Sequence, residues 1–549
     1  MKLLFLCSEQ DINNNNNLVI NYLKLQKEDI TLVSEKITTD FVKKFDFIIS
    51  YSYRYIIKQE IIDLFKNNNI INLHISFLPY NRGSDPNLWS ILDNTPSGVT
   101  IHLIDKGLDT GNILCQKILN FDNENETFTT LYNKLKNDMY LLFIENWDSI
   151  KNNKLIPIKQ NEDMMTKHLL KDRPNLNIIL PYGWNTNVKI AKYLYDNDDK
   201  INFVIKNKII NNNSPTYFIA ELSCNHNQDK SICFKLIEEA HKAGADAIKL
   251  QTYTPDTMTI NCDKPIFKDC LKGSIWEGTT LYDLYSKAYT PWEWHKELKE
   301  YANNLGMDLF TSPFDTTAVD FLETLDMPAY KIASFEITDH ILIKRIARTG
   351  KPVIISSGMA SLSELNDAVS LLRQHGTKHI CMLKCTSAYP AKPEDANLIT
   401  IKHMMDTFNV VGGLSDHTLG IEVPLTSVVL GAKVIEKHFT LSRDSGSPDD
   451  AFSLLPDEFK KMVDSIRIVE KTIGKITYAG VNSESSSKKF RRSLFVVEDV
   501  KKGEKLTEKN VRSIRPSNGL HTMFYDEVIG KQTAMDIERG TPIDWKLFN

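Results

Sequence analysis

The strongest constraint on the fold of this chain is a regular alternation of short apolar runs and helical patterns after residue 215. The apolar runs are TYFIAEL, AIKLQTY, DLFTSPF, AYKIAS, VIISSG, ICMLKCTS, VVGGLSD and VIEKHFT. Segments with helical periodicity, such as SELNDAVSLLRQHG and PDEFKKMVDSIRIVEKTIG, lie between or after them. Eight such strands over this length predict a closed (β/α)8 barrel, with its active site at the carboxyl ends of the strands.

The rest of the chain divides around this barrel. A chain of 549 residues exceeds what one hydrophobic core supports, and the composition changes at the polar segment NNNSP near residue 211. A polar stretch, NSESSSKKFRR, precedes a final segment of short strands and glycine turns. We therefore expect an α/β chain with domains at 1–210, 211–480 and 488–549, the last of them small, β-rich and dependent on docking for its stability.

Composition argues against several classes of partner. Lys and Arg number 66 against 70 Asp and Glu, a net charge of −4, so no basic surface for nucleic acid is expected. The opening MKLLFLCSEQD is too briefly apolar for a signal segment, and no later run has transmembrane length. The eight cysteines are scattered, which supports neither a disulfide framework nor a zinc ribbon. We expect a cytoplasmic protein with no nucleic-acid or membrane partner.

Two histidines end neighbouring strands of the predicted barrel. His417 follows the seventh strand in GLSDHTLG, and His438 ends the eighth in VIEKHFT, so both imidazoles can reach one point at the barrel mouth. Imidazoles with open coordination positions suit a divalent cation that also holds water or a substrate oxygen. Either histidine alone is more often structural, but Asp416 and Glu436 at the same strand ends favour a metal site.

Lys249 and Lys331 end the second and fourth strands, where they face the inside of the barrel. A buried lysine needs an anionic partner or loses its charge. A structural pair with Glu221 or Glu336 is one possibility. A small phosphorylated carboxylate such as phosphoenolpyruvate is the other. It is favoured by hydroxyl groups at further strand ends, those of Ser334, Ser356, Ser387 and Ser415.

Several segments in order, FIAELSCNHNQ, GADAIKLQTYTPDTM, AYKIASFEITD, LKCTSAYP, GLSDHTLG and VIEKHFTL, closely resemble the sialic acid synthase family. Two others, SIWEGTTLYDLYSKAYTPWEWH and SPDDAFSLLPDEF, resemble its pseudaminic acid branch rather than the neuraminic acid branch. The resemblance covers roughly 215–549 and includes the antifreeze-like (SAF) domain at the end. It implies condensation of phosphoenolpyruvate with an open-chain amino sugar, which yields a nine-carbon 2-keto acid and phosphate.

The resemblance also implies roles for individual residues. Glu221 would move protons, and His417 and His438 would hold Mn²⁺ or Mg²⁺. The phosphoenolpyruvate contacts would come from Lys249, Lys331, Ser334, Ser356, Ser387 and Ser415. The sugar and metal side would be lined by Glu336, Tyr389, Glu436 and Asp449. Arg515, in RPSNG, would contact the N-acyl group of the sugar across a domain-swapped homodimer.

The segment INLHISFLP near the start alternates apolar and polar residues, as a strand with Asn72 and His74 on one face. Downstream, Gly107 and Gly111 bracket a tight loop that contains Asp109. Such a set suits acyl transfer to an amine: Asn72 stabilises the oxyanion, His74 exchanges the amine proton and Asp109 holds the imidazole. From spacing alone, ordinary structural roles for the three residues remain open.

The segments NLHISFLPYNRGSDPNLW, GVTIHLIDKGLDTGNIL and LPYGWNT resemble the formyltransferases that use 10-formyltetrahydrofolate, notably their sugar N-formyltransferase members. The resemblance covers roughly 1–200, and Asn72, His74 and Asp109 fall on the catalytic positions of that family. It implies a Rossmann-like domain that formylates an amino sugar. The expected protein is a bifunctional enzyme of nonulosonic acid synthesis. The alternatives are a neuraminic- or legionaminic-type synthase, and a first domain that is a non-catalytic binding or scaffolding module.

Overall fold

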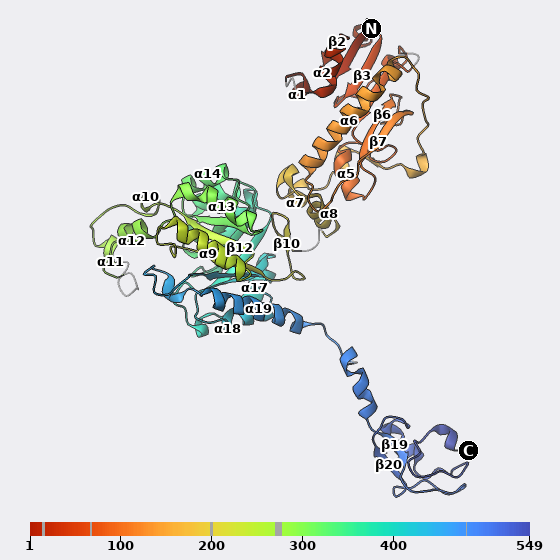
Figure 1. The fold of residues 1–549 in the computed structure, drawn as a ribbon, viewed down its shortest axis with the longest axis vertical. Coiled ribbons are helices and arrows are strands. Elements are labelled where there is room, and N and C mark those ends of the chain that lie inside the picture. The colour runs from red at the N-terminus through yellow and green to blue at the C-terminus, as the bar shows by residue number, and fades with distance from the viewer. Residues whose placement is uncertain (14–16, 66–67, 198–200, 270–276, 479, 549) are drawn as a thin grey trace. The chain divides into compact units, whose positions relative to one another are not determined.

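The computed structural model describes residues 1–13, 17–65, 68–197, 201–269, 277–478 and 480–548 (Figure 1). They form two compact units, Met1–Thr472 and Ile473–Asn549. Residues 274–276 of the segment SIWEGTTLYDLYSKAYTPWEWH lie outside the described residues. Among the described helices, none is both long and apolar enough to cross a membrane.

The first part of the chain folds around a mixed six-stranded sheet in the order β2-β1-β3-β4-β6-β7. The strands are β1 (Lys2–Leu6), β2 (Asp29–Val33), β3 (Phe47–Tyr51), β4 (Ile70–His74), β6 (Gly98–Leu103) and β7 (Ile113–Ile118). β1 to β4 are parallel, and β6 and β7 continue the sheet in antiparallel pairs. Near-continuous apolar runs such as KLLFL and FIISY suit parallel strands that are covered on both faces. The Rossmann-like expectation is confirmed.

Helices cover this sheet, and those in the first crossovers are short. They are α1 (Glu9–Asn13), α2 (Leu18–Leu25), α3 (Thr39–Val42), α4 (Gln59–Ile62), α5 (Pro86–Leu92), α6 (Phe128–Lys151), α7 (Leu176–Ile179) and α8 (Val188–Asp196). Because α3 and α4 have only four residues each, four parallel strands fit before residue 75. α6 begins with a capping box between Thr127 and Thr130 and buries an apolar stripe that includes Phe143 and Trp147.

The central part is a closed barrel of eight parallel strands, as the sequence predicts. The strands are β11 (Tyr217–Glu221), β12 (Ala247–Thr252), β13 (Asp308–Pro313), β14 (Tyr330–Ile332), β15 (Val353–Ser356), β16 (Ile380–Cys385), β17 (Val411–Asp416) and β18 (Val434–His438). Each is followed by an outer helix: α9 (Lys230–Lys242), α13 (His295–Asn304), α14 (Thr316–Thr324), α15 (His340–Ala347), α16 (Leu362–Gln374), α17 (Thr400–Phe408), α18 (Glu422–Val429) and α19 (Pro456–Ile473). Figure 1 shows α9, α13 and α14 outside the strands.

Alternation along the strands separates an apolar floor from a polar mouth. In β11, Tyr217 and Ile219 join the cluster inside the barrel, whereas Phe218 and Ala220 pack outward against the helices. Glu221, two residues after Ile219, therefore points inward at the mouth. The same period places polar residues over apolar ones on β12, β14, β17 and β18, so strand register alone concentrates charge at one end of the barrel.

Two additions modify the barrel. A hairpin of β9 (Phe203–Ile205) and β10 (Lys208–Ile210) contributes Phe203, Ile205 and Ile210 to the cluster at the floor. The hairpin therefore packs with the barrel although it precedes residue 211. The predicted domain boundary near residue 211 stays a prediction. The second addition, between β12 and α13, holds α10 (Pro255–Met258), α11 (Ile266–Asp269) and α12 (Leu281–Ala288).

The last unit is small and has its own core. It contains the antiparallel pair β19 (Ser493–Val496) and β20 (Val511–Ile514), and the short helix α20 (Tyr525–Val528). Leu494, Val496, Val500, Val511 and Ile543 are among the residues of its buried cluster. The expected β-rich C-terminal domain is confirmed. Arg515 directly follows β20 and is exposed within this unit, and its contact with a sugar stays a prediction.

Candidate active sites

The barrel mouth holds a cavity of about 390 Å³ that brings together residues from many strand ends. The predicted residues that line it are Glu221, Lys249, Lys331, Ser334, Glu336, Ser356, Tyr389, Ser415, His417, Glu436, His438 and Asp449. The predicted Ser387 does not line the cavity, but its Oγ lies 3.9 Å from Sγ of Cys385, which does. Residues spread over more than 200 positions of the chain thus meet because parallel strands all end at one rim.

Both buried lysines are in ion pairs. Lys249 Nζ lies 2.8 Å from Glu221 Oε2 and 3.4 Å from Glu436 Oε1, and Lys331 Nζ lies 2.9 Å from Glu436 Oε1. The expected partner Glu221 is therefore found, but Lys331 pairs with Glu436 and not with Glu336. Burial would raise the pKa of Glu436, but Lys249 and Lys331 outweigh it and lower that pKa to about 2. Burial raises the pKa of Glu221 against the effect of Lys249.

Several buried polar atoms at the mouth have no hydrogen-bond partner within the part of the chain that the structure describes. They include Ser356 Oγ, Glu336 Oε2, Glu436 Oε2 and His438 Nδ1. Burial raises the pKa of Glu336 to about 7. Buried polar groups are normally satisfied, so this group of open donors and acceptors indicates a polar ligand.

His417 and His438 lie together, with ring centroids 5.3 Å apart. The Nδ1–H of His417 donates to the carbonyl of Thr386 (2.9 Å), which leaves its Nε2 lone pair free. Burial lowers the pKa of His438 well below its ordinary value. Burial disfavours the charged form of His417 as well, but its hydrogen bond to Cys385 outweighs burial and raises the pKa of His417 above its ordinary value. A divalent cation binds imidazoles in their neutral form, so its binding here would release a proton from His417. Among the described residues, no group of three or more His, Cys, Asp or Glu side chains could hold a metal ion.

Gln251 is a site residue that the sequence interpretation missed. Its Nε2 donates to Glu221 Oε1 (2.8 Å) and to Ser223 Oγ (3.1 Å), and Ser223 in turn donates to Asp449. The amide thereby fixes the orientation of the Glu221 carboxylate. The signal was present, because Gln251 follows Lys249 by two residues in AIKLQTY and so shares its inward face.

The second site lies in the N-terminal domain, in a hollow of about 850 Å³. Asn72 and His74 come from β4, and Asp109 comes from the loop between β6 and β7, as predicted. Asn72 Nδ2 donates to Asp109 Oδ1 (3.2 Å), and His74 Nδ1 lies 3.8 Å from Asp109 Oδ2. The Gly83 N–H also donates to Asp109 Oδ2 (3.0 Å).

The loop that carries Asp109 is shaped by small residues. Asp109 has φ of 54°, a left-handed conformation that Asp tolerates better than most residues. A Cβ added at Gly111 would collide with the Leu103 carbonyl, and one at Gly107 with the Thr110 side chain. The two glycines thus allow the tight turn that aims Asp109 at His74.

His102, on β6, is a second residue that the sequence interpretation missed. Its Nδ1–H donates to the Leu103 carbonyl (2.7 Å), so Nε2 can accept from Asn72 Nδ2 (3.2 Å). Asn72 and His102 are direct partners in the antiparallel pairing of β4 and β6. His102 therefore orients the Asn72 amide, and only the strand register reveals this.

The electrostatics of His74 predict a pH dependence for reactions at this site. Burial lowers the pKa of His74 below its ordinary value of 6.5, despite the opposing effect of Asp109. The imidazole is therefore a neutral base at pH 7 and becomes protonated only as the pH falls through this lowered pKa. We expect the acid limb of kcat/KM for acyl transfer to lie below pH 6.5, measured between pH 5 and 8. An acid limb above pH 7 would contradict this assignment.

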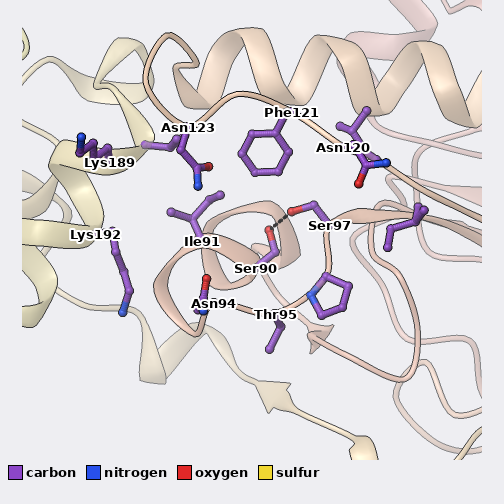
Figure 2. A pocket seen from close by; sticks show the side chains of 14 residues that line it. Ser90, Ile91, Asn94, Thr95, Ser97, Asn120, Phe121, Asn123, Lys189 and Lys192 are labelled. Atoms are coloured by element: carbon purple, nitrogen blue, oxygen red, sulfur yellow. Dashed lines mark hydrogen bonds between the residues drawn. The ribbon is translucent and has the colours of Figure 1, made fainter.

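A further hollow, of about 400 Å³, lies in the same domain away from the triad (Figure 2). Two neighbouring residues of its lining are hydrogen-bonded, since the Ser97 hydroxyl donates to Ser90 Oγ (2.8 Å). Its two lysines are already engaged, Lys189 with Glu124 and Lys192 with Asp196 and the Leu92 carbonyl. We assign it no function.

A closed barrel with a charged mouth and a separate Asn-His-Asp site indicate a bifunctional enzyme. Residues 236–478 match the NeuB family, residues 19–146 the formyl transferase family and residues 491–549 the SAF domain. The pseudaminic acid synthase of Helicobacter pylori is 45% identical over 331 residues, which cover 60% of this chain and 96% of that protein. The chain belongs to the NeuB family.

Two further similarities extend the comparison. A pseudaminic acid synthase of Campylobacter jejuni is 46% identical over 330 residues, 60% of this chain and 96% of that protein. The crystal structure of the formyltransferase PseJ from Anoxybacillus kamchatkensis, in complex with UDP-4,6-dideoxy-4-formamido-L-AltNAc and tetrahydrofolate, is 39% identical. The match covers 35% of this chain and 97% of that one, with a TM-score of 0.32.

Proposed function

We propose that this chain is a pseudaminic acid synthase fused to a sugar N-formyltransferase. The barrel condenses phosphoenolpyruvate with a 2,4-diamido-2,4,6-trideoxyhexose of the altrose type. The first domain formylates the 4-amino group of a precursor of that sugar, in place of the commoner acetyl group. One observation carries this proposal. The same chain holds a NeuB barrel whose mouth is lined by the lysines, carboxylates and histidines expected there, and an Asn-His-Asp triad whose members lie close together.

The barrel residues supply positioning and proton transfer. Lys249 and Lys331 bind the phosphate and carboxylate of phosphoenolpyruvate, with the hydroxyls of Ser356 and Ser415. Carbon 3 of phosphoenolpyruvate bonds to carbon 1 of the open-chain sugar, water adds to carbon 2, and the bond from carbon 2 to the phosphate oxygen then breaks. Glu221, with its raised pKa, holds and transfers a proton near the new hydroxyl.

A divalent cation, Mn²⁺ or Mg²⁺, fits between His417 and His438. When bound, it would polarise the sugar aldehyde and orient water. Tyr389, whose ring centroid lies 4.5 Å from that of His417, and Asp449 border this side of the cavity. We assign the hydroxyl and amide contacts of the sugar to them and to Glu336.

The triad performs acyl transfer to an amine. The amine nitrogen attacks the formyl carbon, Asn72 donates to the developing oxyanion, and neutral His74 takes the proton that the amine loses. The bond between the formyl carbon and the donor nitrogen then breaks, and that nitrogen takes a proton. Asp109 holds His74 in place. The formyl group would come from 10-formyltetrahydrofolate, for which the hollow of about 850 Å³ provides space.

Two further features belong to the proposal. We place the enzyme in the cytoplasm, and we propose a domain-swapped homodimer in which Arg515 contacts the N-acyl group of the sugar in the partner's barrel. An exposed arginine after β20 and a small C-terminal unit with few core residues support such docking.

The test of the synthase is phosphate release from phosphoenolpyruvate by the purified chain with Mn²⁺ and a panel of amino-sugar isomers. We expect turnover with 2,4-diacetamido-2,4,6-trideoxyaltrose and its loss after EDTA treatment. Stimulation by N-acetylmannosamine or by the legionaminic acid precursor instead would establish the neuraminic- or legionaminic-type alternative.

A further inference from the structure

One wall of the barrel cavity is apolar, in contrast to the charged residues opposite. It is built by Met258 of α10, by α12 and by Phe314, the residue after β13. On α12 the cavity-lining residues are Leu281, Leu284, Tyr285 and Ala288. This spacing of i, i+3, i+4 and i+7 is one face of a helix, while Asp283 and Lys287 are exposed to solvent.

This helix face does not serve the hydrophobic core of the barrel. Leu281, Leu284 and Tyr285 are only half-buried and do not belong to the cluster between strands and outer helices. Tyr285 packs edge to face on Tyr253 (centroids 5.6 Å apart), and Tyr253 does so on Phe314 (5.2 Å), which ties the wall to the strand ends. An apolar face that is fixed in place yet directed at a cavity is suited to an apolar part of a ligand.

The barrel geometry fixes which part of the sugar reaches the wall. In the closed order of strands, β13 lies directly opposite β17. In the proposed mechanism carbon 1 of the sugar reacts near His417, which follows β17, and a carbon chain that extends from there across the mouth ends near Phe314, which follows β13. The end farthest from carbon 1 is carbon 6. The amide groups on carbons 2 and 4 need polar partners, which other residues of the lining supply: Gln251, Glu336 and Asp449.

We propose that Leu281, Leu284 and Phe314 recognise the methyl group at carbon 6 and so select 6-deoxy sugars against their 6-hydroxy counterparts. This inference rests on the proposed synthase function. A hydroxyl against these side chains loses its hydrogen bonds to water without replacement. A hydrophobic site rejects such an added hydroxyl by a factor on the order of 10².

The experiment compares kcat/KM for phosphate release with 2,4-diacetamido-2,4,6-trideoxyaltrose and with its 6-hydroxy analogue, using the full chain and Mn²⁺. We expect the wild type to prefer the 6-deoxy sugar about 100-fold, and Leu284→Asn to reduce this preference about 10-fold. The matched control is Ile341→Asn on α15, where the side chain is 75% exposed; it should keep the wild-type ratio.

The outcomes distinguish failure of the inferred methyl recognition from failure of the proposed synthase function. Equal use of both sugars by the wild-type enzyme overturns the inference while the synthase stands, and this arm needs no variant to fold. A Leu284→Asn variant that turns over the 6-deoxy sugar with an unchanged ratio also overturns it. Phosphate release with neither sugar, whether the group on carbon 4 is acetamido or formamido, overturns the proposed function and the inference together.

Discussion

Replacing His74 with glutamine should lower kcat/KM for formyl transfer by about 10²–10⁴-fold, the usual contribution of a general base. Glutamine keeps a hydrogen-bonding side chain of similar length but cannot accept a proton from the amine. His74 is buried, and its partners are Asp109 and the Asn81 carbonyl. The glutamine side chain can still form hydrogen bonds with these two partners, so neither is left buried without one. The measurement is transfer from 10-formyltetrahydrofolate to a 4-amino sugar.

Phosphate release by the same preparation is the control, because the barrel site is built from other residues and should keep its rate. Formyl transfer that survives His74→Gln would remove the triad from the mechanism. A wild-type chain without formyl transfer to any amino sugar would favour a binding or scaffolding role for the first domain.

The reciprocal prediction concerns Glu221, which is fully buried at the barrel mouth. Glu221→Gln should lower kcat for phosphate release by about 10²–10⁴-fold, because the amide cannot transfer the proton. The fold should persist, since Gln251 can still donate to the remaining oxygen and Lys249 keeps Glu436 as a partner.

Formyl transfer by the Glu221→Gln variant provides the internal control and should equal the wild-type rate. A variant with near-normal phosphate release would assign the proton transfer to another group at the mouth. A parallel fall in both activities would indicate a general loss of folded protein. Thermal unfolding of the wild type and of the Glu221→Gln variant would reveal such a loss.

The sequence predicted the architecture because strand alternation is a local property. Eight apolar runs with helices between them are compatible with few folds, and a polar residue two positions after an apolar inward residue must face the mouth. Glu221, Lys249 and Glu436 were predictable on that basis. The clustering of Asn72 and His74 likewise followed from the period of a single strand.

Pairings between strands were not predictable from local patterns. That His102 faces Asn72 depends on the register between β4 and β6. That Lys331 pairs with Glu436 rather than Glu336 depends on closure of the barrel, which sets β14 opposite β18. That the apolar face of α12 borders a cavity was not predictable either, because the same helical periodicity is typical of a helix packed on a core.

In the proposed function, both domains act in the synthesis of one product. The most direct measurement is kcat/KM for Mn²⁺-dependent phosphate release with 2-acetamido-2,4,6-trideoxyaltrose that carries either a 4-formamido or a 4-acetamido group. We expect a preference for the 4-formamido sugar, since the first domain would supply that group. Turnover of the 4-acetamido sugar alone would contradict it, leaving a synthase whose first domain acts on something else.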